Sequence, residues 1–267
     1  MEASRWVRRA LGAYVAIAVA FLTLPQLVVI AVSFNNTPRM VVPGTEWSLQ
    51  WYKALLASDG FGTAFLLSFA MAPLVAVAAV LLGGAAAYGV ARFAGRGTGL
   101  VQALFVAPLL LPVTALAVGM FLFFHTLGLT NTIWAVAISH VVIAIPYAFR
   151  TLLAAVGGVD RRLEEAAMSL GATRARAIRR VTVPLNTPGI SAAALFCLIV
   201  SLDEITVTLF VGAREVKTIP IQIFDQTEYG LDPTVAAAST VLIVVSALVI
   251  LLLNRTIGLR RAYSLGK

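Results

Sequence analysis

Residues 164–184 read Glu-Glu-Ala-Ala-Met-Ser-Leu-Gly-Ala-Thr-Arg-Ala-Arg-Ala-Ile-Arg-Arg-Val-Thr-Val-Pro. This segment is a polar island between strongly apolar stretches of the chain. Asp160, just before it, can cap a helix that begins at Arg161, and acids in the first turns suit the positive end of a helix dipole. Gly171 can end this helix, and Thr173 can begin a second one. The sequence therefore predicts two short helices joined by a turn.

The second of these helices is expected to close at Pro184, before the next apolar stretch. Ala166, Ala167 and Leu170 would form a small, smooth surface on the first helix, suited to docking another protein. The alternative is an amphipathic surface loop whose arginines only follow the charge bias of membrane proteins.

The composition places this island in a membrane protein. The chain has 267 residues, of which 60% are hydrophobic and only 12% are charged, and its mean hydropathy is +0.93. Soluble domains carry about 25% charged residues. Cys197 is the single cysteine, which excludes a disulfide framework.

Six stretches have the roughly 20 apolar residues that a membrane-spanning helix needs. They are residues 10–33, 62–91, 100–124, 132–153, 187–211 and 234–254. The first is too long for the apolar region of a signal peptide, and no small-residue cleavage site follows it. We therefore expect an all-α polytopic protein whose whole length, residues 1–267, forms one transmembrane domain.

The basic residues orient these spans. If both termini are cytoplasmic, all of the 20 Lys and Arg residues lie on inner segments except Arg39, Lys53, Arg214 and Lys217. Basic residues concentrate on the cytoplasmic side of membrane proteins. The formal net charge of +8 is thus explained by topology, and no nucleic-acid partner is needed.

Local patterns refine this scheme. Apolar residues within 48–57 have the spacing of a short amphipathic helix on the membrane surface, and the small residues 83–87 permit close helix packing. The loop 212–232 is a candidate contact for an external delivery protein, with a short helix expected around 219–227. Kinks are expected at three prolines inside the third and fourth spans, namely Pro108, Pro112 and Pro146.

The polar island resembles a known motif. Glu165-Ala166-Ala167, Gly171 and, after nine residues, Val181-Thr182-Val183-Pro184 look like the EAA loop of ABC importer permeases. That pattern runs Glu-Ala-Ala, three residues, Gly, nine residues and Ile-x-Leu-Pro, so Val181 and Val183 are conservative departures. The resemblance covers nearly the whole chain, including Trp51-Tyr52 and the segment 201–204, and is to the second permease of spermidine/putrescine-type importers.

This resemblance implies a place in an assembly. It implies a second permease subunit, with a heterodimer favoured, two ATPase subunits and a periplasmic or lipid-anchored substrate-binding protein, all at a bacterial inner membrane. The loop at about 160–184 would be a cytoplasmic coupling helix that sits in a groove of the ATPase. Its candidate residues are Glu164, Glu165, Ala166, Ala167, Leu170, Gly171, Ala172 and Pro184.

The chain has no G-x-x-x-x-G-K-[ST] sequence, so ATP and Mg²⁺ are expected on the partner ATPase and no cofactor in this chain. No His, Cys, Asp or Glu group has metal-ligand spacing. His140 follows Ser139, but adjacent residues diverge on a helix and no G-x-S-x-G elbow exists, so a polar contact between helices is expected instead of hydrolase chemistry.

Asp203 and Glu204 lie in the fifth predicted span, and ionisable groups in such positions usually face a pathway or a partner. On a regular helix adjacent residues diverge by about 100°, so the two are not expected to face one pathway equally. Structural bonding between helices is the alternative. Two acids favour a cationic solute such as putrescine or spermidine over an anion.

Other functions stay open at this point. Relatives of this permease type carry ferric iron, oxyanions and phosphonates as well as polyamines. A self-contained secondary transporter is the rival of another class, but such folds commonly contain internal repeats, and none is visible here. A membrane-embedded enzyme is a more distant third.

Overall fold

The computed structural model describes residues 5–38, 46–93, 95, 97–212, 215–229 and 233–257, with only the backbone of residues 5, 59 and 252–257. The described chain is helical throughout, without a β-strand, which confirms the expected all-α class. It divides into two compact units, one of residues 1–62 and 222–247 and the other of residues 63–221 and 248–267. The assignment of one transmembrane domain to residues 1–267 stays a prediction.

The first unit contains the N-terminal helix α1 (Arg5–Ser33) and the short helix α2 (Gln50–Ala57), which confirms that a short helix lies within residues 48–57. The Trp51 indole donates a hydrogen bond to the Asn35 carbonyl at 2.6 Å. The Ser33 and Tyr52 hydroxyls are 2.7 Å apart. These bonds tie α2 to the end of α1.

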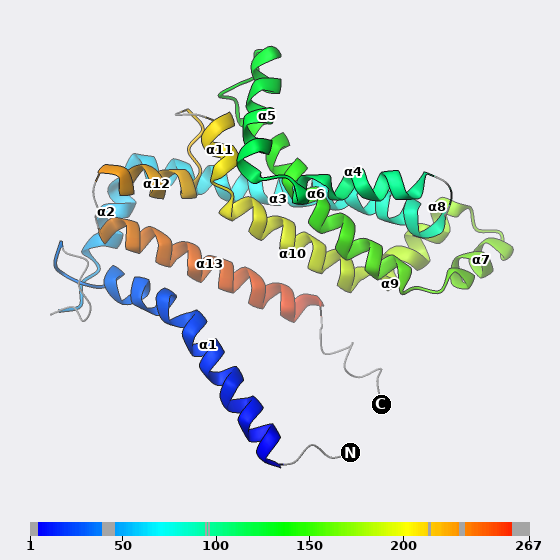
Figure 1. The fold of residues 1–267 in the computed structure, drawn as a ribbon, viewed down its shortest axis with the longest axis horizontal. Coiled ribbons are helices and arrows are strands. Elements are labelled where there is room, and N and C mark those ends of the chain that lie inside the picture. The colour runs from blue at the N-terminus through cyan, green and yellow to red at the C-terminus, as the bar shows by residue number, and fades with distance from the viewer. Residues whose placement is uncertain are drawn as a thin grey trace. The chain divides into compact units, whose positions relative to one another are not determined.

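The second unit holds most of α3 (Asp59–Arg92) and the helices from α4 to α11. Helix α10 (Thr187–Asp203) packs along α6 (Ile133–Gly157), as Figure 1 shows, and α4 (Thr98–Leu110) also packs on α6. Helix α11 (Thr206–Val211) packs against α6 and α5 (Val113–Thr126). The remaining short helices are α7 (Arg161–Ser169), α8 (Arg174–Ala177) and α9 (Val183–Leu185).

The small residues at 83–87 allow the close packing that was expected of them. A Cβ atom on Gly83 would lie 2.9 Å from the backbone nitrogen of Phe149, which real side chains do not tolerate. Gly83 therefore lets α3 approach the backbone of α6.

Among the described residues, four helices are long and apolar enough to cross a membrane, and two bent pairs bring the total to as many as six if each pair is one span. The four lie at Trp6–Ser33, Gly60–Arg92, Ile133–Gly157 and Pro233–Leu251. They coincide with the first, second, fourth and sixth predicted spans. The last belongs to α13 (Pro233–Ile257), and α12 (Ile219–Tyr229) confirms the helix expected near 219–227.

The third predicted span is not one helix. Helices α4 and α5 meet at 104°, and the break lies at Leu111 and Pro112, both in extended backbone. Proline disfavours the helical conformation of the residue before it, so Pro112 ends α4 instead of bending a continuous helix. Pro108 and Pro146, in contrast, lie inside unbroken helices.

Two further expectations were wrong in detail. The chain stays helical through Pro184, because a π-helical segment (Ile178–Thr182) precedes it and Pro184 sits in the first turn of α9, where no backbone donor is required. The turn comes at Asn186, where the segment 174–185 meets α10 at 75°. The fifth predicted span, 187–211, ends at Asp203, and Glu204 has extended backbone.

Candidate functional site

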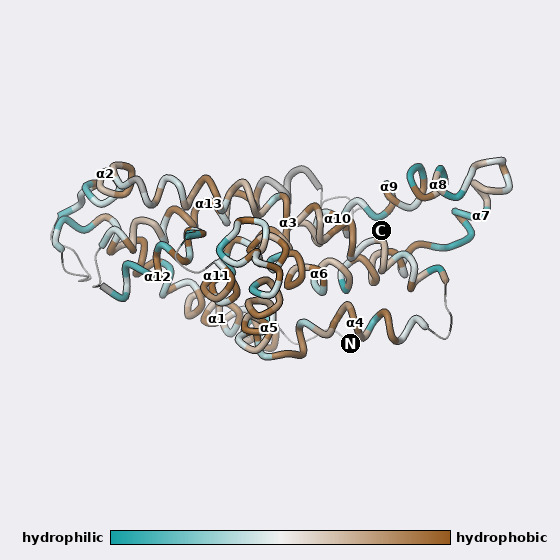
Figure 2. The backbone as a smooth tube through the Cα atoms, turned by 90° about the horizontal axis from the view of Figure 1, so that it is seen from above, coloured by the Kyte–Doolittle hydropathy of each residue, from teal (hydrophilic) through white to brown (hydrophobic). Residues whose placement is uncertain are grey.

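The predicted pair of short helices is present in the polar island, with the predicted caps. The Asp160 carboxylate accepts a hydrogen bond from the Arg162 backbone N–H at 2.9 Å and begins α7. Gly171 has φ +89°, a conformation that only glycine adopts without strain, and it makes the turn after α7. The Thr173 hydroxyl accepts from the Arg176 N–H at 3.3 Å and begins α8. In Figure 2, α7 and α8 carry long hydrophilic (teal) stretches.

We call residues 160–184 the α7–α8 loop. Most of its predicted docking residues face outward: Glu165, Ala166, Leu170, Gly171 and Pro184 are exposed, and Ala167 and Ala172 are partly so. Leu170 is 91% exposed, which is unusual for an apolar side chain on a polar segment. The loop therefore offers a small apolar contact surface with a charged edge.

Glu164 is the exception, because it is only 5% exposed and points back into the second unit. Its Oε1 accepts from Arg92 Nε at 2.8 Å, and its Oε2 accepts from the Tyr88 hydroxyl at 2.8 Å. Burial by itself would raise the pKa of Glu164, but these hydrogen bonds and the Arg92 charge outweigh burial and lower the pKa. The sequence reasoning did not single out Tyr88 or Arg92, whose i, i+4 spacing at the end of α3 was the available signal.

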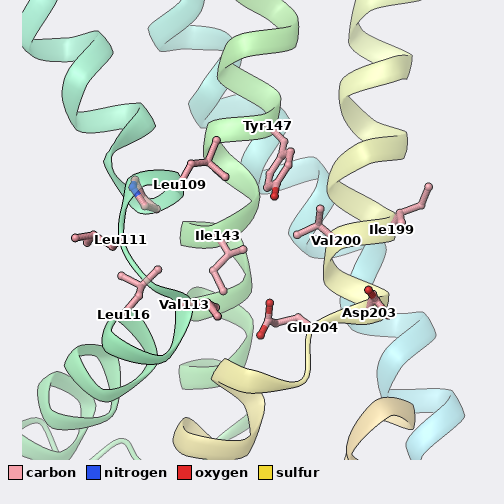
Figure 3. Close-up of a pocket in the computed structure, with 11 residues that line it drawn as sticks. Leu109, Leu111, Val113, Leu116, Ile143, Tyr147, Ile199, Val200, Asp203 and Glu204 are labelled. Atoms are coloured by element: carbon pink, nitrogen blue, oxygen red, sulfur yellow. The ribbon is translucent and has the colours of Figure 1, made fainter.

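A second polar site lies where α10 ends. A cavity of about 330 Å³ opens between the α4–α5 break, α6 and the end of α10 (Figure 3). Asp203, Glu204 and Tyr147 supply its polar groups, and no lining residue in this described part of the chain is basic. The other lining residues are apolar: Pro108, Leu109, Leu111, Val113, Leu116, Ile143, Ile199 and Val200.

Both predicted acids line this cavity, although a regular helix would have separated them. The helix stops at Asp203, and Glu204 is extended, so the expected divergence of about 100° does not apply. Figure 3 shows the Glu204 carboxylate directed into the cavity and Asp203 at its edge. Glu204 Oε1 also accepts the Val207 N–H at 2.9 Å and so caps α11.

We call the junction of α10 and α11, residues 203–208, the α10–α11 corner. His140, on α6, holds this corner in place, and the polar contact expected of His140 is confirmed. Its ring nitrogens lie 3.0 Å from the Ser201 hydroxyl on α10 and 2.7 Å from the Thr208 hydroxyl on α11. The Thr208 hydroxyl also donates to the Glu204 carbonyl at 3.2 Å. Ser139, by contrast, donates to the Ala135 carbonyl of its own helix. His140 therefore joins the two helices on either side of the break.

The two sites belong to the same unit and are connected by one element. Helix α10 has 17 residues, about 25 Å at 1.5 Å per residue, and runs from the end of the α7–α8 loop to the acidic cavity. Within the described residues, no cluster of His, Cys, Asp or Glu could hold a metal ion. The described part of this unit therefore combines an exposed polar loop at one end of α10 with an acidic cavity at the other.

Comparison with known proteins agrees with this arrangement. The family model described as "Binding-protein-dependent transport system inner membrane component" matches residues 79–262. The spermidine/putrescine transport system permease protein PotC of Haemophilus influenzae is 28% identical over 243 residues, 90% of this chain and 93% of that protein. The putrescine transport system permease protein PotI of Escherichia coli K12 is 31% identical over 207 residues, 74% of this chain and 73% of that protein.

A solved structure also shares the fold. A chain of a bacterial ABC transporter involved in the import of the acidic polysaccharide alginate superposes with a TM-score of 0.72 and 16% identity. The match covers 96% of this chain and 98% of that one.

Proposed function

The chain belongs to the family of binding-protein-dependent transport system inner membrane components, and on that premise we propose that it forms half of an import pathway for polyamines such as putrescine and spermidine. It is a permease subunit of an ABC importer. The observation that carries the substrate assignment is the cavity at the α10–α11 break, where two carboxylates and a tyrosine stand among apolar side chains.

The cavity chemistry matches an alkyl polyamine. Such a molecule is a chain of methylene groups with ammonium groups at its ends and, in the longer members, between them. Asp203 and Glu204 attract the ammonium groups by charge, while the side chains of Leu116, Ile143 and Val200 contact the methylene chain. An anionic solute would meet two like charges with no basic residue beside them.

The α7–α8 loop is the proposed contact with an ATPase subunit. Leu170 and Ala166 present apolar surface, and Glu165 adds a charge next to them. Gly171, Ala172 and Pro184 shape the turn and the exit of this surface. Interfaces commonly concentrate their binding energy in a few apolar anchors surrounded by polar residues, and Leu170 has the exposure expected of such an anchor before its partner docks.

The rest of the assembly follows from the relatives. Proteins named as permeases of binding-protein-dependent systems work beside other subunits, so we assign a second permease, two ATPase subunits and an external binding protein to this chain. The charge bias supports the proposal that both termini and the α7–α8 loop lie in the cytoplasm of a bacterium. ATP and Mg²⁺ belong to the ATPase subunits.

The test is transport by the complete complex. The importer, purified through a tag on this chain with its accompanying subunits and reconstituted into vesicles, is offered labelled putrescine with ATP on the ATPase side. We expect saturable uptake that unlabelled spermidine competes away and that sulfate, a phosphonate and ferric iron do not affect.

Competition by an anion or by ferric iron, without competition by spermidine, would overturn the substrate assignment and leave the importer assignment intact. Uptake that continues in vesicles without an ATPase subunit would instead indicate a self-contained transporter. Cysteine labelling of positions 174 and 228 from each side of the membrane tests the orientation, with position 174 expected inside and position 228 outside.

A further inference from the structure

The contacts of Glu164 tie α7 to the end of α3, far away in the sequence. Both carboxylate oxygens are occupied, one by Arg92 and one by Tyr88. Arg92 Nη2 also donates to the Val159 carbonyl at 3.0 Å, and Arg161 Nη1 donates to the Arg92 carbonyl at 3.4 Å. Bonds therefore run in both directions between the last turn of α3 and residues 159–164. We call Tyr88, Arg92 and Glu164 the α3–α7 cluster.

A separate contact ties α8 to the same end of α3. The Arg174 guanidinium lies over the Phe93 ring, 4.7 Å from its centroid, and Phe93 directly follows Arg92 in the chain. Cation–π contacts at this distance are attractive. Both short helices of the α7–α8 loop are thus held by the end of α3.

The chain segment that connects α7 to α6 is flexible by comparison. Helix α6 ends at Gly157, and Gly157-Gly158-Val159 lead to the cap of α7 at Asp160. Consecutive glycines are the most permissive backbone in a chain. A displacement of α7 would therefore change the backbone of this connection before it displaced α6, unless another contact linked α7 to the transmembrane helices.

The ion pair of Arg92 and Glu164 is buried, so removing either charge is expected to have a large effect. The side chains of Arg92 and Glu164 are each 7% exposed. The lowered pKa of Glu164, caused by its hydrogen bonds and by the Arg92 charge in spite of burial, keeps the carboxylate ionised at neutral pH. Removing one member of such a pair leaves the other as an uncompensated buried charge.

We propose that Arg92 and Tyr88 are positioning residues for energy coupling: through Glu164 they fix the α7–α8 loop to α3, so that movement of the loop by the ATPase is carried into a membrane-crossing helix. This inference rests on the proposed function of the loop. It separates two roles within the loop, since Glu165 and Leu170 are exposed and open to a partner while the adjacent Glu164 faces this chain's own α3.

The experiment measures the coupling ratio, which is the solute taken up per ATP hydrolysed, in vesicles containing the complete importer. Glu164→Gln keeps the side-chain shape and removes the charge. We expect ATP hydrolysis to continue while the coupling ratio falls about five- to tenfold, within the usual range of coupling between sites. The double exchange Arg92→Glu with Glu164→Arg restores the opposite charges and should recover a large part of the ratio.

Two further variants keep the result decisive. Tyr88→Phe leaves the ion pair and removes one hydrogen bond, so we expect it to assemble even if Glu164→Gln does not, and its ratio to fall by about twofold because the ion pair remains. Arg150→Gln removes an exposed arginine of α6 outside the cluster and serves as the control for loss of a positive charge. A merely structural role would lower the amount of complex but not the ratio in the complex that remains.

A wild-type coupling ratio in assembled Glu164→Gln, or in Tyr88→Phe if the former does not assemble, would overturn the proposal. Failure of the underlying function gives a different result. If Glu165→Lys on the exposed face also transports normally, the loop does not dock the ATPase at all. If Glu165→Lys uncouples transport and the cluster variants do not, only the positioning role is lost.

Discussion

The α7–α8 loop and the α10–α11 corner are two polar regions of this largely apolar chain, and they are built in different ways. The helix caps of the loop are local: the Asp160 and Thr173 side chains accept hydrogen bonds from backbone N–H groups two and three residues further along the chain. The corner is made by His140, which reaches residues 61 and 68 positions away. The loop presents most of its side chains outward, with Glu164 as the exception, and the corner turns the Glu204 carboxylate toward a cavity.

This difference assigns the two regions different kinds of work. The loop has local caps and a local turn and presents most of its side chains outward, which suits a contact with a separate subunit. A corner held by distant helices changes when those helices move, which suits a solute site that must open and close. Helix α10 joins the two regions, so a movement at one end has a rigid element along which to reach the other.

The largest expected effect is at the turn of the loop. Gly171→Asp places a side chain at φ +89°, which costs about 1–2 kcal/mol for a residue other than glycine, and puts a charge in the docking surface. We expect uptake to fall by roughly a hundredfold while the complex still inserts in the membrane. Uptake and ATP hydrolysis are measured together in vesicles.

Gly99→Ala is the matched control for this change, because a Cβ atom there meets nothing within 4 Å and the backbone is helical. Unchanged solute-stimulated ATP hydrolysis in Gly171→Asp would remove the loop from the coupling role.

The acidic pair gives the next largest effect. Glu204→Gln keeps the carbonyl-type oxygen that caps α11 and removes the charge. Asp203→Asn keeps the side-chain shape and removes the charge at the edge of the cavity. We expect the KM for putrescine to rise about tenfold in each, equivalent to about 1.4 kcal/mol of lost attraction, with normal assembly. Initial uptake rates across putrescine concentrations give the KM.

Glu204→Ala loses both the cap of α11 and the charge, so its comparison with Glu204→Gln separates the two effects. A normal KM in Asp203→Asn and Glu204→Gln together would contradict the cationic-solute assignment.

The residues in these first two predictions also show which features of the structure could be predicted from the sequence. Asp160, Gly171 and Thr173 act on their immediate neighbours, so their residue types alone predicted the helix starts and the turn. Glu164 looked equivalent to Glu165, because its partner Arg92 is 72 residues away and no local pattern records that contact. In the same way, the periodicity of residues 187–211 did not reveal that the helix breaks at Glu204, since that break is held by His140 from another helix.

His140→Ala tests the long-range construction of the corner and should have a smaller effect. It removes two hydrogen bonds, each worth about 0.6 kcal/mol in membrane proteins, so we expect a loss of about 1 kcal/mol in stability. Thermal unfolding of the purified complex in detergent measures the loss. Ser139→Ala is the control, since that hydroxyl donates to a carbonyl of its own helix, and equal losses in both variants would show that the corner is not held by His140.

Tyr147→Phe should have the smallest effect of the series. The hydroxyl lies in the cavity wall (Figure 3), and loss of one hydrogen bond worth about 0.5 kcal/mol, the lower end of the usual range, raises the KM about two- to threefold. A competition series with putrescine and spermidine would sharpen the comparison, because a direct contact at one point in the cavity affects the two lengths differently. Identical shifts for both solutes would indicate a general effect on the cavity instead.

The most direct test of the central claim is the uptake of labelled putrescine by vesicles that contain the complete importer, with and without ATP. The account predicts uptake only when ATP and the ATPase subunits are present, competition by spermidine but not by sulfate, and loss of uptake in Gly171→Asp with the complex still assembled. Putrescine uptake that persists without ATP, or an importer indifferent to putrescine and spermidine, would contradict it.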